Sequence, residues 1–187
     1  VFGGHPHAAE PAQGLGHLTI SINVSALQFQ PGLLDDVQAV IDTHDLPHGA
    51  IEIELTESAV MADPEAAIAI MNRLNALGVS IAVDDFGTGY SSLAYLKRLP
   101  IARLKIDRSF VRDLGQDEDD EAICTSIITL ARSLNLRTVA EGVETEEQRN
   151  WLLAQGCDEL QGFLLGRPVA FDSILAMLAP ESVEDPP

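Results

Sequence analysis

Six short apolar runs with the pattern of β-strands alternate with helix-like runs along this chain of 187 residues. The predicted strands comprise residues 18–24, 51–55, 80–83, 103–106, 138–140 and 159–165. As a set they are too apolar on both faces for an open antiparallel sheet, and this is typical of parallel strands covered by crossover helices. With 46% hydrophobic residues, the chain can bury a core of its own. We therefore predict one α/β domain with a parallel sheet.

Local signals place the helices between these strands. The predicted helices comprise residues 33–41, 64–77, 92–99, 121–134, 145–155 and 173–178. Asp63 and Pro64 are typical of a helix start, and Thr145 and Gln148 have the spacing of a capping box. Residues 1–17 are rich in Gly, Pro, Ala and His without a sustained period. We expect them to form a loosely ordered lead-in to a domain over residues 18–178, which an acidic tail over residues 179–187 follows.

Each predicted unit delivers a polar side chain at or near the carboxyl end of its strand. These residues are Asn23, Glu54, Asp84, Lys105, Glu141 and Gln161. A (β/α)8 barrel builds its active site from groups released at this end of its strands, whereas a doubly wound sheet concentrates them at one switch point. We therefore predict a TIM-like (β/α)8 barrel. It is expected to be incomplete, because six units are found and the chain is shorter than the ~250 residues typical of that fold.

Two adjacent carboxylates, Asp84 and Asp85, stand where the third predicted strand leads into the glycine-punctuated loop of residues 86–92. Neighbouring residues of a strand point to opposite faces, so both can approach one cation only where the strand is ending. A strand that runs into an ordinary acidic turn is the alternative, because Asp and Gly are common turn formers. The other strand-end residues favour an active site over that alternative.

The strand-end groups suit hard divalent cations. Oxygen ligands, without Cys or His, favour Mg²⁺ or Mn²⁺ over Zn²⁺, and they are offered by Asn23, Glu54, Asp84 and Asp85. Two such ions can clamp a phosphodiester during in-line attack. Lys105 could then hold the phosphate or help to position a water, and Glu141 could accept a proton from water. A surface ion pair or a loop hydrogen bond is the alternative for any one of these residues alone.

The charge balance limits the partners. The formal net charge is -18, from 29 acidic and 11 basic residues, which argues against binding duplex nucleic acid through a basic surface. A small phosphorylated ligand is not excluded if cations neutralise it locally. Cys124 and Cys157 match no metal-binding spacing, and we interpret them as buried free thiols of a reducing compartment. No apolar run approaches the length of a membrane span and no signal pattern is found, so we expect a cytoplasmic protein.

Six stretches occur in order along the chain, Ser21-Ile-Asn-Val-Ser25, Glu54-Leu-Thr-Glu57, Asp84-Asp-Phe-Gly-Thr-Gly-Tyr-Ser-Ser92, Leu104-Lys-Ile-Asp107, Glu141-Gly-Val-Glu144 and Gln161-Gly162. In this order they resemble the EAL family of bacterial cyclic-di-GMP phosphodiesterases. The stretch that begins at Asp84 is highly specific, whereas the pair Gln161-Gly162 would be weak alone. The resemblance covers residues 18 to about 178.

The resemblance implies hydrolysis of cyclic-di-GMP to linear pGpG by two Mg²⁺ or Mn²⁺ ions. By matched position, the metal ligands would be Asn23, Glu54 and Asp84, with Asp85 serving the second ion. Lys105 would contact the phosphate and the nucleophilic water, and Glu141 would act as base. Glu144 and Gln161 would support the site.

The resemblance also implies a coupling between the site and a dimer interface. Glu57 would hold the loop that contains Phe86, Gly87, Thr88 and Gly89. In this family the position of that loop couples metal binding to dimerisation. We therefore expect a homodimer formed through the loop and the helix that follows it.

One departure from the family pattern bears on activity. The sequence contains no Glu-Ala-Leu triplet, although in this family that Glu is a metal ligand, and the missing part would be about the first two strands with their helices. We expect low activity of this chain alone and an unpaired, aggregation-prone edge on the strand of residues 18–24. Two alternatives remain open, a non-catalytic module that binds cyclic-di-GMP or a protein, and a fragment that does not fold alone.

Overall fold

The computed structural model describes residues 18–89 and 93–178. The predicted lead-in, the predicted acidic tail and the loop residues 90–92 lie outside these ranges, so the predicted domain limits remain a prediction.

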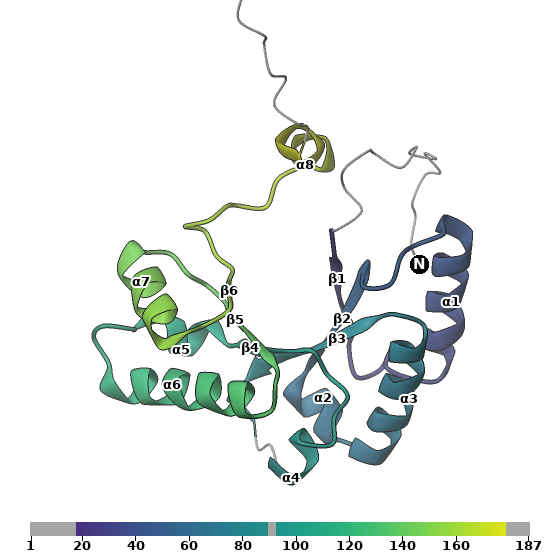
Figure 1. The fold of residues 1–187 in the computed structure, drawn as a ribbon, viewed down its shortest axis with the longest axis horizontal. Helices are drawn as coiled ribbons and strands as arrows, with labels where there is room; N and C mark the ends of the chain where they lie inside the picture. Colours follow the sequence, from purple (N-terminus) through teal and green to yellow (C-terminus); the bar gives the residue numbers. More distant parts are fainter. Residues whose placement is uncertain (1–17, 90–92, 179–187) are drawn as a thin grey trace, which may run out of the picture.

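The described residues contain a curved, six-stranded parallel sheet (Figure 1). Its strands are β1 (Ile20–Asn23), β2 (Ile51–Thr56), β3 (Ser80–Phe86), β4 (Arg103–Ile106), β5 (Arg137–Ala140) and β6 (Glu159–Leu160). Each strand pairs with its neighbours in the sequence, in the order β1-β2-β3-β4-β5-β6. A doubly wound sheet would reverse its order at a switch point. The incomplete (β/α)8 barrel predicted from the sequence is therefore confirmed.

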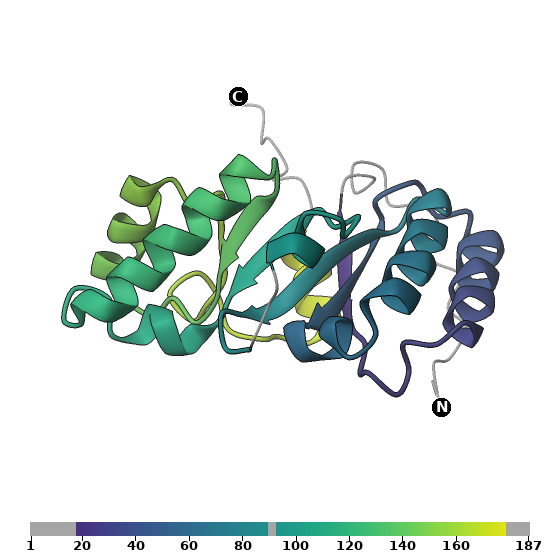
Figure 2. The ribbon, with the colours of Figure 1, turned by 90° about the horizontal axis from the view of Figure 1, so that it is seen from below.

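The helices lie mainly on the convex side of this sheet (Figures 1 and 2). They are α1 (Gly32–His44), α2 (Glu57–Met61), α3 (Pro64–Ala76), α4 (Leu93–Leu96), α5 (Arg108–Arg112), α6 (Glu118–Ser133), α7 (Glu146–Gln155) and α8 (Phe171–Leu178). In Figure 1, α8 is set apart from the other helices, above the opening of the curved sheet. Two short helices, α2 and α5, were not predicted, because each has only five residues and begins within two residues of the end of a strand.

The predicted helix ends are local effects that the structure confirms. Asp63 caps α3 by accepting a hydrogen bond from the backbone of Ala66 at 3.2 Å, with Pro64 as the first helical residue. Thr145 and Gln148 form the expected capping box of α7, and Gly156 ends that helix with a φ of 83°. A left-handed residue at this position is most easily supplied by Gly.

The strand predicted over residues 159–165 is wrong in length, because β6 has two residues. After Leu160 the backbone turns against the segment that follows β5. The amide of Leu164 donates to the carbonyl of Val143 at 3.0 Å, and a Cβ built at Gly162 would lie 2.1 Å from that same carbonyl oxygen. Close contact between backbones, which only Gly permits here, replaces further strand pairing.

The two faces of the sheet differ in polarity. Ile53, Leu55, Ile81 and Leu104 are at most 1% exposed and form the core between the sheet and the helices. The two cysteines are buried free thiols, as predicted. On the inner face the strands carry charged side chains, whereas the interior of a typical barrel is filled by bulky aliphatic ones.

The first strand forms one edge of the described sheet. β1 pairs only with β2 among the described residues, and the side chains of Ile20 and Ile22 are 67% and 37% exposed. The unpaired edge expected from the sequence is thus present in this part of the chain. No helix within the described ranges is long and apolar enough to cross a membrane.

Candidate active site

Side chains from the carboxyl ends of neighbouring strands converge on the inner face of the sheet. In register, Asn23 of β1 lies opposite Glu54 of β2, and Thr56 of β2 lies opposite Asp84 of β3. Lys105 is on β4, and Glu141 directly follows β5. We call Glu54, Asp84, Asp85, Lys105 and Glu141 the acidic site.

A bulge in β3 brings Asp84 and Asp85 together. The strand does not end before these residues, as the sequence suggested, but continues to Phe86. Its register shifts between Val83 and Phe86, and Asp85 has a left-handed backbone with a φ of 53°. An extra, left-handed residue breaks the alternation of faces that a regular strand imposes. One oxygen each of Asp84, Asp85 and Glu141 then lie within 4.8 Å of one another.

Lys105 lies at the centre of the acidic site. Its ammonium is 2.7 Å from Glu54 Oε2, 3.2 Å from Asp84 Oδ1 and 2.6 Å from Glu141 Oε1. The side chain is 5% exposed. Burial acts to lower the pKa of Lys105, but the hydrogen bonds that its ammonium donates to Glu141 and Glu54 and the nearby negative charges outweigh this effect, so the pKa is raised. The ammonium therefore stays charged and holds three carboxylates from three strands.

Two carboxyl groups of the site, those of Asp85 and Glu141, have raised pKa values, mainly because burial disfavours their charged forms. Burial is the largest cause for Glu141, reinforced by the charges of Asp84 and Glu54 and opposed by Lys105. Burial is also the largest cause for Asp85, followed by a hydrogen bond with Asp107 and by the charge of Asp84. With its four carboxyl groups ionised, the acidic site carries more negative charge than the single ammonium of Lys105 compensates.

Asp107 lies beside the acidic site, although it was not among the site residues predicted from the sequence. Its carboxyl group is close enough to that of Asp85 to raise the pKa of Asp85. Burial acts to raise the pKa of Asp107, but hydrogen bonds from the side chain and backbone of Ser109 and from Asp85 lower it overall. Asp107 is also the N-cap residue of α5, because its side chain accepts a hydrogen bond from the amide of Ser109 at 2.9 Å. Because Asp107 directly follows β4, the rule used for the other strand ends could have found it.

Glu57 contacts the loop that follows the site. It is 1% exposed, and its Oε2 accepts hydrogen bonds from the amides of Gly87 at 3.0 Å and Gly89 at 3.4 Å. A Cβ at Gly89 would lie 2.7 Å from Glu57 Oε1, an oxygen without a hydrogen-bond partner in the described structure. The hydroxyl of Thr88 donates to the carbonyl of Asp85 at 2.8 Å, and Phe86 is buried. The loop is thereby tied to the bulge.

Three residues selected from the sequence lie around this cluster without joining it. These residues are Asn23, Glu144 and Gln161. Their side chains are exposed and form no hydrogen bond with the described residues. The backbone amide of Glu144 donates to Gln148 Oε1 at 2.7 Å, and that of Gln161 donates to Ala140 at 2.8 Å. These contacts fix the two backbones and leave the side chains free to meet a ligand.

The donor chemistry fits hard divalent cations. All acceptors in the acidic site are carboxylate oxygens, and the site contains four carboxylates but one ammonium. Oxygen-only sites with excess negative charge suit Mg²⁺, Mn²⁺ or Ca²⁺, whereas Zn²⁺ would favour nitrogen or sulfur ligands. A site with these donors can bind cations and, through them, a phosphorylated ligand.

Comparison with known proteins identifies the relatives of this chain. The model of the EAL domain matches residues 7–168. The bifunctional diguanylate cyclase/cyclic di-GMP phosphodiesterase MucR of Pseudomonas aeruginosa is 52% identical over 161 residues, which cover 86% of this chain and 24% of that protein. The chain thus spans about a quarter of the length of this relative.

Solved structures agree with the sequence matches. The PaMucR phosphodiesterase in complex with c-di-GMP has a TM-score of 0.81 and 52% sequence identity, covering 83% of this chain and 64% of that one. Klebsiella pneumoniae BlrP1 with manganese and cyclic-di-GMP has a TM-score of 0.74 and 32% identity, covering 80% of this chain and 39% of that one. A second BlrP1 complex contains calcium in place of manganese.

Proposed function

Because the chain belongs to the EAL domain family, we propose that it binds cyclic-di-GMP and hydrolyses it to linear pGpG at the acidic site. The observation that carries this proposal is the convergence of Glu54, Asp84 and Glu141 on Lys105, with Asp85 brought in by the bulge. This arrangement has the excess negative charge that divalent cations neutralise, and bound cations would in turn attract a phosphodiester.

The residues fit two Mg²⁺ or Mn²⁺ ions. Asn23, Glu54 and Asp84 would hold the first ion, because Asn23 and Glu54 are in register on adjacent strands. Asp85 and Asp107, which interact closely enough for each to shift the pKa of the other, would hold the second. Two such ions polarise the phosphodiester and lower the pKa of the attacking water.

Lys105 and Glu141 would act directly on the reacting groups. Lys105 already organises three carboxylates, and its ammonium would also bind a phosphate oxygen and orient the nucleophilic water. Glu141 would accept the proton of that water. Its raised pKa supports this role, since a general base works best with a pKa close to the working pH. Glu144 and Gln161, whose side chains are free, would support the bound substrate.

We extend the proposal to a homodimer formed through the loop and α4. Glu57 holds Gly87 and Gly89, and Thr88 is bonded to the backbone of Asp85. A shift of Asp85 on metal binding would therefore move the loop. The next described residue, Leu93 on α4, is 61% exposed and could pack against a second copy. The molar mass in solution, measured by light scattering with and without Mn²⁺, would test this coupling. A protein that stays monomeric under both conditions would contradict it.

We expect this chain to hydrolyse cyclic-di-GMP slowly by itself. It contains no Glu-Ala-Leu triplet, and the side of the site next to β1 is exposed. Loss of one carboxylate ligand misplaces the nucleophile, and a small misplacement can cost about 10²-fold in rate. The second candidate function is therefore a module that binds cyclic-di-GMP without hydrolysing it.

The deciding experiment is the incubation of purified protein with cyclic-di-GMP and Mn²⁺, followed by chromatographic detection of pGpG. The matched control is Glu54→Gln, which removes one charge and keeps the shape of the side chain. Slow turnover that the control and EDTA abolish would support hydrolysis at this site. Binding of cyclic-di-GMP by calorimetry without any pGpG would refute hydrolysis and favour the binding module.

A further inference from the structure

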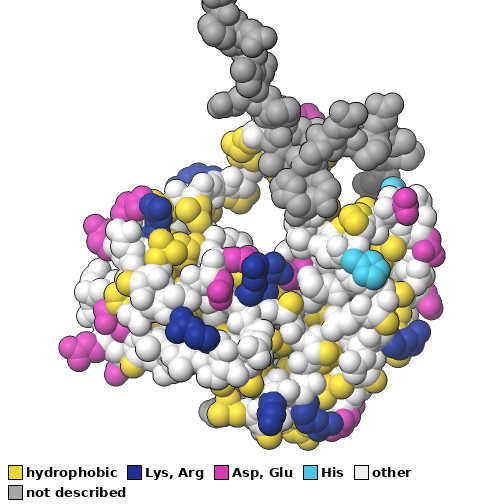
Figure 3. All heavy atoms as spheres, viewed as in Figure 1, with side chains coloured by type: hydrophobic (Ala, Val, Ile, Leu, Met, Phe, Trp, Pro, Cys, Tyr) yellow, Lys and Arg dark blue, Asp and Glu magenta, His cyan; other side chains and the backbone are white. Residues whose placement is uncertain are grey.

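A second charged layer lies on the inner face of the sheet, toward the amino ends of the strands. Side chains two residues apart on a strand share a face, so Glu52 lies below Glu54 on β2 and Arg103 lies below Lys105 on β4. Figure 3 shows basic and acidic side chains side by side at the centre of one face of the molecule. We call the second layer the lower network, which consists of Ser21, Glu52, Ser80, Arg103, Arg137 and Glu159.

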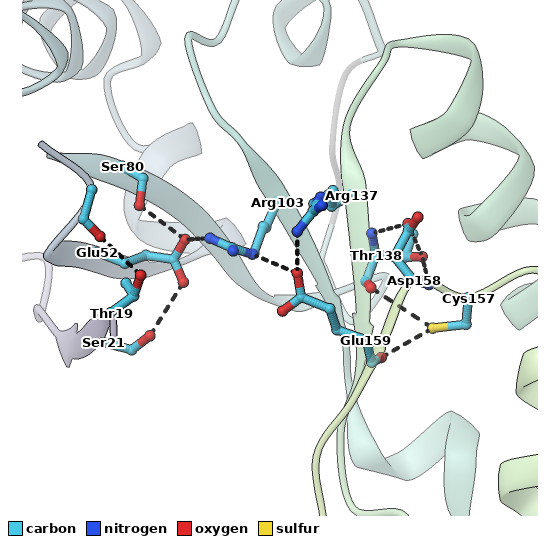
Figure 4. Close-up of polar contacts among 11 residues, drawn as sticks. Thr19, Ser21, Glu52, Ser80, Arg103, Arg137, Thr138, Cys157, Asp158 and Glu159 are labelled. Atoms are coloured by element: carbon cyan, nitrogen blue, oxygen red, sulfur yellow. Dashed lines mark hydrogen bonds and ion pairs between the residues drawn. The ribbon is translucent and has the colours of Figure 1, made fainter. Parts of the chain in front are cut away.

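The lower network joins all six strands. Glu52 accepts hydrogen bonds from Ser21 at 3.2 Å and Ser80 at 3.1 Å, and it pairs with Arg103. Arg103 lies between Glu52 and Glu159 (Figure 4), with its Nε 3.3 Å from Glu159 Oε1. The same Glu159 oxygen is 2.9 Å from Arg137. Two guanidinium groups balance two carboxylates, so this layer needs no external cation.

The two layers contain parallel bridges from β2 to β4. Arg103 reaches Glu52 and Lys105 reaches Glu54, and both bridges pass over β3 and join residues 51 positions apart. Ala82 of β3 is in register with both Glu54 and Arg103. Its methyl group is small enough to leave room for the long side chains that cross it. The Arg103–Glu52 pair therefore sets the distance between β2 and β4 that the Lys105–Glu54 pair must span.

We propose that Arg103 is a positioning residue for Lys105. The planar guanidinium is held from two sides, by Glu52 on β2 and Glu159 on β6, and a fork of this kind fixes geometry in a way that a single ammonium does not. It anchors the first residue of β4 on the inner face. Lys105, two residues further along the same strand, thereby keeps its three carboxylates within reach. The consequence for hydrolysis rests on the proposed function, whereas the placement of Lys105 does not.

The chain offers a direct probe of this placement, because Lys97 and Lys105 are its only lysines. Lys97 is exposed and serves as internal reference, whereas the Lys105 side chain is 5% exposed. Trace acetylation with acetic anhydride in EDTA, read by mass spectrometry, gives the labelling ratio of Lys105 to Lys97. If Arg103 positions Lys105, Arg103→Met should raise this ratio by about tenfold or more, as expected when local opening becomes easier.

The matched control is Arg137→Met. Arg137 is in register with Arg103 on β5 and pairs with Glu159, but its side chain is 65% exposed and does not contact Glu52. The labelling ratio should change little in this variant. An equal rise in both variants would overturn the proposal, because it would indicate general loosening of the sheet.

A double variant separates positioning from stability. Arg103→Met alone leaves Glu52 buried without a counter-charge, whereas Glu52→Leu combined with Arg103→Met removes both charges and is expected to fold. The Lys105 ratio should remain raised in this folded protein, and kcat should fall while KM stays nearly constant. Arg103→Lys, which keeps the charge but cannot bridge two carboxylates, should give a smaller rise. If the folded variants had the same ratio of Lys105 to Lys97 labelling as the wild type, the positioning role of Arg103 would be overturned. This holds whether or not the wild type hydrolyses cyclic-di-GMP.

Discussion

The two charged layers on the inner face of the sheet each contain an ion pair from β4 to β2, but they differ in charge balance. In the lower network two guanidinium groups meet two carboxylates, and serine hydroxyls complete the hydrogen bonds of Glu52. In the acidic site one ammonium pairs with three of four carboxyl groups, and two of the four have raised pKa values. A layer that balances its own charge stabilises the fold, whereas a layer with unbalanced charge is prepared for a ligand.

The largest effect is expected from Lys105→Met. This change leaves Glu54, Asp84 and Glu141 without their common counter-charge in a buried site. Breaking a buried ion pair from one side typically costs about 3–5 kcal/mol. The free energy of unfolding, measured in urea with EDTA present, should fall by an amount in this range. Arg137→Met at the exposed end of the lower network should cost far less, and equal losses would remove the distinction between the layers.

A smaller effect is expected from added cations. Mn²⁺ should raise the thermal midpoint of the wild type, since a ligand at 100 times its Kd stabilises the folded state by about 2.7 kcal/mol. Asp84→Asn should weaken this stabilisation, because it removes a carboxylate of the acidic site. Glu52→Gln should leave it nearly intact even if the basal stability falls. If Glu52→Gln and Asp84→Asn reduced the stabilisation by Mn²⁺ equally, the proposed difference between the two layers would be wrong.

The loop next to the acidic site gives the third test. Gly89→Ala places a methyl group 2.7 Å from Glu57 Oε1, so the buried carboxylate or the loop must shift. We expect a loss of about 1–2 kcal/mol, as for other overpacked positions. Gly32→Ala is the control, because no atom lies within 4 Å of the added carbon and Ala favours the helix. Denaturant midpoints of both variants measure the difference, and equal stability would show that the loop yields freely.

The smallest effect is the pH dependence of the acidic site without metal. The folded state raises the pKa values of Asp85 and Glu141, so their contribution to stability is present below the ordinary carboxylate pKa. It is lost as the pH rises through the higher folded pKa. Because Asp85 is partly solvated, we expect a change of only about 0.5 kcal/mol. Urea unfolding of the wild type and Asp85→Asn in EDTA, from pH 4 upward, should show the dependence reduced in the variant.

The sequence predicted the fold because its main signals are local. The caps at Asp63 and Thr145 each need only three or four consecutive residues. The polar strand ends were found in the same way, since parallel strands bring their carboxyl ends to one edge of a sheet. The length of β6 was wrong because the contact of Gly162 with Val143 joins segments whose approach no local pattern encodes.

By itself, the sequence determined the order of the units, the chemistry of the strand ends and the negative charge that excludes a basic nucleic-acid surface. Only the tertiary structure decided how these groups meet. The bulge at Asp85, the pairing of Asp85 with Asp107 and the bridge from Arg103 to Glu52 all depend on how neighbouring strands are placed. Helix caps and strand patterns follow from short-range sterics and hydrogen bonds. Charge pairs across several strands follow from strand register and burial, which are properties of the assembled sheet.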